Sequence, residues 1–246
     1  MLDETIIEGI VSHYSHASAF QKWHMRGRLK LCPYDALLKH LEGWKKDQSS
    51  NPADEVEKPI SILDIGCGFG HFGWYLKNMH LPLKYLGVDI DSRKIALAKG
   101  SLTEQEKIPK ENSVHKPLEF IFGNCSEIIS NDTRFQNIVI LDVIYLLPWD
   151  LQVQLIEWCL LHLDPNCKSA LVIKTMDVAE GWVGWRTVAE EWIMVHLLRR
   201  TQSSGTINGI KPFQNYVDVF NRLGFNCEIE NLPTWNPSSI FKATRK

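Results

Sequence analysis

Short apolar runs alternate with longer amphipathic segments over most of the chain, from residue 60 onward. Each run is short enough to be a buried parallel strand, and the segments between the runs have helical periodicity. The alternation predicts an α/β fold with a doubly wound, mainly parallel sheet and right-handed crossovers. The predicted strands are Ile60–Ile65, Lys84–Val88, Leu118–Phe122, Ile138–Leu141 and Ala170–Ile173, and the predicted helices are His71–Lys77, Arg93–Leu102 and Leu151–Leu163.

Two further apolar runs near the end of the chain, Phe225–Ile229 and Ser239–Ala243, are separated only by a loop that contains two prolines. A parallel connection needs a crossover of about a dozen residues or more, usually a helix, and no helical pattern lies between these runs. We therefore expect an antiparallel strand at this end of the sheet, which would have seven strands in all.

The first 44 residues are predicted to be helical, with Pro33 opening a helix that carries an apolar stripe. Residues 45–59 hold two prolines and almost no apolar side chains, as is typical of a loop. The expected organisation is an N-terminal helical lid or appendage (1–44), a loop (45–59) and a Rossmann-like domain (60–246).

Charge and cysteine usage narrow the class of protein. The 246 residues carry 27 Lys and Arg against 29 Asp and Glu, so the net charge of −2 gives no overall attraction to nucleic acid or to an anionic membrane. The longest nearly apolar stretch, 138–149, is too short to span a bilayer, and acids stand where a signal peptide would be basic. The six cysteines form no CxxC pair, which favours reduced thiols and a cytoplasmic protein without a metal centre.

The strongest local motif is ILDIGCGFGHFG, which directly follows the first predicted strand and places Asp64 ahead of Gly66, Gly68 and Gly70. Glycines at such a turn let the backbone approach a ligand closely. The same segment also fits the dinucleotide pattern GxGxxG, and Asp89 ends the next strand about 20 residues on, so a nicotinamide-dependent oxidoreductase is an alternative.

The spacing D-x-G-x-G-x-G resembles motif I of the class I S-adenosylmethionine-dependent methyltransferases, and the antiparallel C-terminal strands are similar to the last two strands of that family. The resemblance extends over about residues 58–246 and implies S-adenosylmethionine as the cofactor. It implies that Asp89 binds the ribose hydroxyls, that Asn124 meets the adenine where many members have an acid, and that Asp142 lies near the methionine end. The cofactor-binding residues predicted in this way are Asp64, Gly66, Gly68, Gly70, Asp89, Ile90, Asn124, Cys125 and Asp142.

Two neighbours of these residues have structural interpretations. Asp91 is interpreted as the N-cap of the helix that follows it, and Gly73 as a packing position of helix against strand.

The acceptor is expected beyond the carboxyl ends of the strands, framed by the loops after the fourth and fifth strands. From Gly9 to Tyr34 the chain has cations and no Asp or Glu, so an N-terminal lid would offer positive charge to a carboxylate or phosphate; a solvated helix face is the alternative. The candidate acceptor-binding residues are Tyr14, Trp23, Arg26, Arg28, Trp149, Trp182 and Trp185, of which the last two are equally consistent with a packed helix start. The candidate catalytic residues are His24, His13 and Tyr145.

The resemblance implies an enzyme that transfers a methyl group, by in-line displacement, to a small acceptor that is anionic or bears an aromatic group. A protein or RNA substrate is the nearest alternative, although the segment DVIYLLPW after the fourth strand lacks the Asn/Asp-Pro-Pro-aromatic block of many RNA enzymes. The sequence also leaves open a nicotinamide-dependent oxidoreductase and a non-catalytic binding module.

Overall fold

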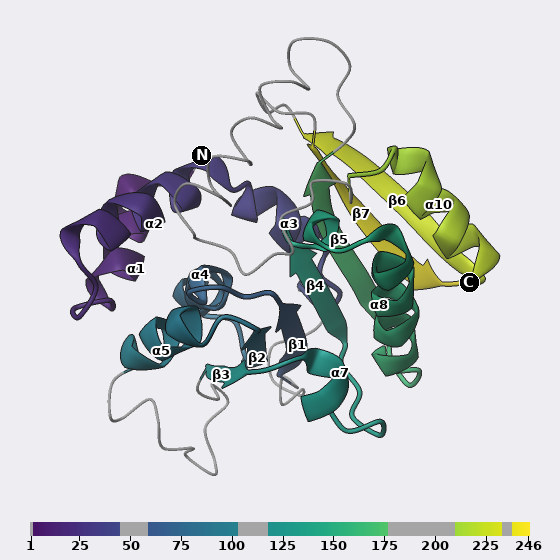
Figure 1. Ribbon diagram of the computed structural model, residues 1–246, viewed down its shortest axis with the longest axis horizontal. Helices are drawn as coiled ribbons and strands as arrows, with labels where there is room; N and C mark the ends of the chain where they lie inside the picture. The colour runs from purple at the N-terminus through teal and green to yellow at the C-terminus, as the bar shows by residue number, and fades with distance from the viewer. Residues whose placement is uncertain (1, 45–58, 103–117, 177–209, 233–237) are drawn as a thin grey trace, which may run out of the picture.

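The computed structural model describes residues 2–44, 59–102, 118–176, 210–232 and 238–246 (Figure 1). Their strands form one seven-stranded sheet in the order β3-β2-β1-β4-β5-β7-β6. β1 to β5 are parallel to one another, whereas β7 runs antiparallel to β5 and β6, which confirms the predicted fold class. The strands are β1 Ile60–Ile65, β2 Leu83–Asp89, β3 Glu119–Phe122, β4 Asn137–Leu141, β5 Ala170–Met176, β6 Phe225–Leu232 and β7 Ser238–Arg245.

Helices cover both faces of the sheet, and the two faces bury separate apolar clusters. Alternate side chains of a strand point to opposite faces, so Ile62 joins one cluster and Leu63 the other. The first face is covered by α1 Glu4–Ser12, α2 Ala19–Leu31, α3 Tyr34–His40, α4 His71–Asn78 and α5 Ser92–Gly100. The second face is covered by α7 Cys125–Ile128, α8 Trp149–His162 and α10 Phe213–Arg222, and the short 3-10 helix η1 Ile144–Leu146 follows β4.

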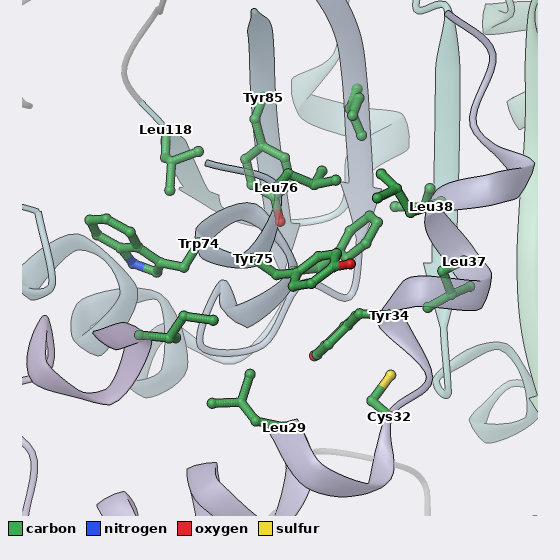
Figure 2. Packing of buried hydrophobic residues seen from close by; sticks show 14 of the residues in the cluster. Leu29, Cys32, Tyr34, Leu37, Leu38, Trp74, Tyr75, Leu76, Tyr85 and Leu118 are labelled. Atoms are coloured by element: carbon green, nitrogen blue, oxygen red, sulfur yellow. The ribbon is translucent and has the colours of Figure 1, made fainter. Parts of the chain in front are cut away.

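The N-terminal helices share the core of the sheet (Figure 2). Leu29 of α2 and Leu37 of α3 are buried in the same cluster as Trp74 and Tyr75 of α4. The ring of Tyr34 stacks on Tyr75 with a centroid distance of 5.2 Å. Burial of these side chains therefore holds α2 in a fixed place over the sheet.

Local sequence explains where the helices that flank the site begin. Ser18 and Gln21 form a capping box at the start of α2. Asp91 caps α5 by accepting a hydrogen bond from the backbone of Arg93, as predicted. A Cβ on Gly73 would lie 2.8 Å from the ring of Tyr85, so the absence of a side chain lets α4 pack on β2.

The register of the parallel strands brings their carboxyl ends together. Ile65 is paired with Val88 of β2 and with Ile140 of β4, and Asp89 with Phe122 of β3. The loops that follow these four strands therefore start at one edge of the sheet. Among the described residues, no helix is long and apolar enough to cross a bilayer.

Candidate cofactor and acceptor site

A cavity of about 1470 Å³ lies at the carboxyl ends of β1 to β4. Its wall is formed by the loops after these strands and, on the other side, by α2, the start of α4 and η1. Sites for single small molecules typically measure about 300–1,000 Å³. The cavity is therefore large enough for a cofactor and a second molecule together.

The glycine-rich bend after β1 is open toward this cavity at one position. Gly66, Gly68 and Gly70 all have left-handed backbone conformations, with φ of +75°, +58° and +79°. A Cβ on Gly66 would lie 2.6 Å from Val143, and one on Gly70 would lie 2.3 Å from the ring of Phe120. A Cβ on Gly68 would meet no atom within 4 Å, so the bare backbone at Gly68 faces open space.

Asp89, at the end of β2, faces the bend and fixes it. Its Oδ2 accepts a hydrogen bond of 2.8 Å from the backbone N–H of Gly68, and its Oδ1 accepts one of 2.8 Å from that of Asp91. Each carboxylate oxygen has a second lone pair, so Asp89 retains the capacity to accept from two hydroxyl groups. The bend and Asp89 thus form a continuous polar edge on the wall of the cavity.

Asp64 lies in β1, is buried, and is among the residues that line the cavity. Its Oδ2 accepts a hydrogen bond of 2.5 Å from the hydroxyl of Tyr85. Burial raises the pKa of the Asp64 carboxyl to about 7, against the opposing effect of the Tyr85 hydrogen bond and with a further contribution from the charge of Asp89. Asp64 therefore connects β1 to β2 below the bend.

The loop after β3 places Asn124 and Cys125 on the wall of the cavity. The side-chain amide of Asn124 already has hydrogen-bond partners within the protein. Its Oδ1 accepts from the backbone N–H of Ser126 at 3.2 Å and from the Ser126 hydroxyl at 3.1 Å, so Asn124 is the N-cap of α7. Ile90, with 53% of its side chain exposed, lines the same end of the cavity.

Asp142 follows β4 and pairs with two cations. It adopts a left-handed backbone with φ of +58°, and its carboxylate contacts the ammonium of Lys174 in β5 and, at 3.6 Å, the guanidinium of Arg28 in α2. Burial alone would raise the pKa of Asp142, but the charges of Lys174 and Arg28 outweigh it and lower the pKa. Of these three charged groups, Arg28 and Asp142 line the cavity, and Lys174 is buried beside Asp142.

Three of the predicted acceptor-side residues line the cavity: His24 and Arg28 of α2, and Tyr145 of η1. Two other candidates, His13 and Tyr14, do not line the cavity. The ring of His13 stacks on Trp74 at a centroid distance of 3.6 Å, and the hydroxyl of Tyr14 donates to the backbone oxygen of Phe69 at 2.5 Å. Both residues thus attach the end of α1 to α4 and to the glycine bend.

Three further acceptor predictions, Arg26, Trp23 and Trp149, do not line the cavity. Arg26 forms an ion pair with Glu8 of α1, with 2.5 Å between Nε and Oε1. Trp23 is 66% exposed and stacks on Phe20. Trp149 packs edge-on against Tyr216 of α10, whereas Leu151 of the same helical turn lines the cavity. Trp182 and Trp185 lie outside the described residues.

His71 is a cavity residue for which the sequence pattern predicts only a place at the start of a helix. It follows Gly70, lines the cavity and is 7% exposed, and its Nε2 has no hydrogen-bond partner. Burial, with smaller effects from Arg28 and His24, lowers the pKa of its imidazole to about 3. The sequence signal that could have identified His71 is a titratable side chain directly after the glycine motif. The described residues contain no cluster of three or more side chains suited to hold a metal ion.

The sheet order, the reversed β7 and the glycine bend define a class of Rossmann-like folds that bind a cofactor at the carboxyl ends of the strands. Residues 62–166 match the model of a family described as a methyltransferase domain. A tRNA (guanine-N(7)-)-methyltransferase of Prochlorococcus marinus (strain MIT 9215) is 34% identical over 77 residues, which are 31% of this chain and 32% of that protein. The match thus spans about a third of that relative's length.

Two solved structures share the fold over nearly the whole chain. The plantazolicin methyltransferase BpumL, in complex with a pentazolic desmethylPZN analog and SAH, has a TM-score of 0.55 at 15% identity and covers 99% of this chain and 100% of its own. Magnesium protoporphyrin IX methyltransferase (ChlM) from Synechocystis PCC 6803, with bound SAH, has a TM-score of 0.56 at 16% identity and covers 99% and 95%. Over residues 62–166 the chain is therefore similar to a methyltransferase domain, and its fold is that of the two SAH-bound methyltransferases.

Proposed function

We propose that this protein binds S-adenosylmethionine and transfers its methyl group to a small acceptor that is anionic or bears an aromatic group. The observation that carries the proposal is the open backbone at Gly68 facing the carboxylate of Asp89, inside a cavity large enough for two molecules. SAH bound in structures of the same fold supports the choice of cofactor.

The residues of the bend fit this cofactor. Gly68 leaves room for a ligand against the backbone, and Asp89 has free lone pairs for the two hydroxyls of a ribose. Ile90 offers apolar surface at the same end. The bound cofactor supplies an electrophilic methyl group on a sulfonium, so the protein has to orient the acceptor in line with the breaking bond and exclude water.

The acceptor would lie between the bend and α2. Arg28 lines the cavity beside Asp142, whose carboxylate is already paired with Lys174, and this favours an acceptor with negative charge. Phe20, Phe72 and Tyr145 line this part of the cavity and offer aromatic surface.

Calorimetric titration with SAH, NAD and NADP tests the cofactor. We expect binding of SAH alone, and we expect Asp89→Ala to weaken it by about a hundredfold, because the variant loses hydrogen bonds to the ribose and the clamp on the bend. Preference for a nicotinamide would contradict the proposal, and the absence of binding to all three would favour a non-catalytic module.

Transfer of labelled methyl groups tests the acceptor class. The protein is incubated with labelled S-adenosylmethionine and, separately, a dialysable metabolite extract, bulk tRNA and whole-cell protein. We expect label in the metabolite fraction, and a loss of transfer in Arg28→Ala that Arg26→Ala does not share. Label in tRNA would instead favour an activity like that of the Prochlorococcus relative.

A further inference from the structure

His71 occupies the boundary between the two parts of the cavity. It is the first residue of α4 and directly follows Gly70, the last glycine of the bend, while Arg28 and His24 of α2 lie on the acceptor side. Its ring contacts Tyr14 edge-on at 5.7 Å between centroids and lies 5.6 Å from the ring of Phe69. The side chain is thus held in place by neighbouring rings, on the wall that both ligands would share.

The Nε2 atom of His71 is buried and has no hydrogen-bond partner. Buried polar atoms in native proteins nearly always have one, because an unpaired polar group loses the hydrogen bonds that water would make with it. At a cavity wall, a ligand can supply the missing partner.

The surroundings of His71 keep its ring neutral. Burial, the guanidinium of Arg28 and the imidazole of His24 all lower its pKa, to about 3, and Tyr14 brings no charge near neutral pH because burial raises its pKa further above the ordinary value. A neutral imidazole has one nitrogen that donates and one that accepts. The positive charge on Arg28 opposes protonation of the ring, so His71 is suited to accept a hydrogen bond rather than to take up a proton.

His162 shows that an unpaired buried nitrogen is not enough to define a site. Its Nε2 is also buried without a partner. However, its Nδ1 is hydrogen-bonded to the backbone oxygen of Trp158 at 2.8 Å, its ring stacks on Trp158, and it does not line the cavity. Within the described part of the chain, only His71 combines an unpaired ring nitrogen with a large cavity and cationic neighbours.

We propose that His71 is an acceptor-binding residue whose Nε2 accepts a hydrogen bond from an O–H or N–H of the small molecule that receives the methyl group. This inference rests on the proposed function and deepens it, because it selects acceptors that carry an O–H or N–H able to donate to Nε2. The hydrogen bond orients the acceptor beside the bend, and His71 itself takes up no proton.

The test compares three variants. His71→Phe keeps the bulk of the ring and removes the nitrogen, His71→Gln keeps a hydrogen-bonding group, and His162→Phe is the matched control. Two quantities are measured for each: the rate of labelled methyl transfer to the dialysable metabolite extract, and the affinity for SAH by calorimetry. We expect His71→Phe to lower the rate by about ten- to hundredfold with the SAH affinity unchanged within about threefold, His71→Gln to recover most of the rate, and His162→Phe to leave both unchanged.

Several results would overturn the inference. Full transfer by His71→Phe would show that the nitrogen has no role, and an equal loss of SAH affinity would assign His71 to the cofactor. Failure of His71→Gln to recover transfer would exclude a role limited to hydrogen bonding.

A second measurement needs no acceptor. Nitrogen-15 NMR of the histidine rings should show His71 neutral from about pH 8 to pH 5, and protonation in that range would sink the inference. The proposed function is judged separately, on the wild-type protein: if it binds no SAH or labels no metabolite, that function fails, whatever the variants show.

Discussion

The two sides of the cavity differ in the atoms that form them: one consists mainly of backbone and the other of side chains. On the proposed cofactor side, backbone atoms of the glycine bend are held by strand pairing and by the Asp89 clamp. On the proposed acceptor side, the wall includes side chains from helices: Arg28 of α2, His71 of α4 and Tyr145 of η1. Backbone geometry depends on the fold as a whole, whereas helix side chains can change without altering the sheet. Substitutions should therefore affect stability and cofactor binding on the first side, and acceptor choice on the second.

Asp142 is the residue at which the two sides meet. It follows a strand, as the residues proposed to bind the cofactor do, yet it pairs with Arg28 from α2. Its left-handed backbone is uncommon for a residue with a side chain, although Asp and Asn tolerate it best.

The largest effect is expected from Asp142→Asn. The substitution keeps a residue that tolerates the left-handed backbone but leaves the buried ammonium of Lys174 without its carboxylate. Breaking one partner of a buried pair costs about 3–5 kcal/mol. Urea unfolding should show a loss of stability of that size, and Asp132→Asn, at an exposed acid, should show little change.

The pH dependence of this difference has a definite sign. The pKa of Asp142 is lowered in the folded protein, so its stabilising effect is complete above its ordinary value of 3.8 and is lost as the pH falls through the lower folded value. The gap between wild type and Asp142→Asn should shrink only below about pH 4. A gap that stays constant down to acid unfolding would contradict the ion pair.

Asp64 should make the stability of the protein depend on pH in the opposite direction. Its pKa is raised by burial to about 7, above the ordinary value of 3.8, so the folded state binds more protons than the unfolded state between these values. Stability should therefore fall as the pH rises from about 4 to about 7, by at most about 4 kcal/mol. Asp64→Asn, which can still accept from Tyr85, should lack this decline in urea unfolding measured across the same range. If the stability of the wild type and of Asp64→Asn changed with pH in the same way, the raised pKa of Asp64 would be refuted.

Two glycine substitutions in the bend distinguish an effect on stability from an effect on cofactor binding. Gly70→Ala combines a left-handed backbone with a collision against Phe120, and should cost about 3 kcal/mol of stability. Gly68→Ala has only the backbone cost of about 1 kcal/mol, because its Cβ enters open space. That space is where we place the cofactor, so Gly68→Ala should weaken SAH binding by about tenfold or more. Unchanged SAH affinity in Gly68→Ala would place the cofactor elsewhere.

The sheet and the bend could be predicted because their signals are local. Apolar runs, glycines and the acid at the end of β2 carry the information in consecutive residues, and parallel strand pairing then brings Asp89 to the bend. The acceptor side could not be predicted in this way. Whether Arg26 or Arg28 faces the cavity depends on how α2 is rotated over the sheet, and that is decided by the burial of Met25 and Leu29.

Aromatic residues were the least informative part of the sequence. Trp149 follows β4 at a position that indicates a site, but its ring packs on Tyr216 because α10, some 70 residues later, lies beside it. Similarly, His13 was a candidate base and stacks on Trp74. Long-range packing of this kind leaves no pattern in neighbouring residues. By contrast, a polar histidine at position 71, among the apolar residues that begin a helix, is a local pattern.

The smallest effect is expected from Arg26→Ala, and it tests the division of α2 into two sides. Arg26 lies two positions from both His24 and Arg28, so it points away from the face that they share, and it pairs with exposed Glu8 of α1. Exposed ion pairs contribute little to stability, because water and salt screen them. The urea midpoint and the rate of labelled methyl transfer should both stay within experimental error, while Arg28→Ala lowers transfer. If Arg26→Ala reduced transfer as much as Arg28→Ala, the effect of the helix on the acceptor would come from its total charge and not from a side chain on the cavity wall.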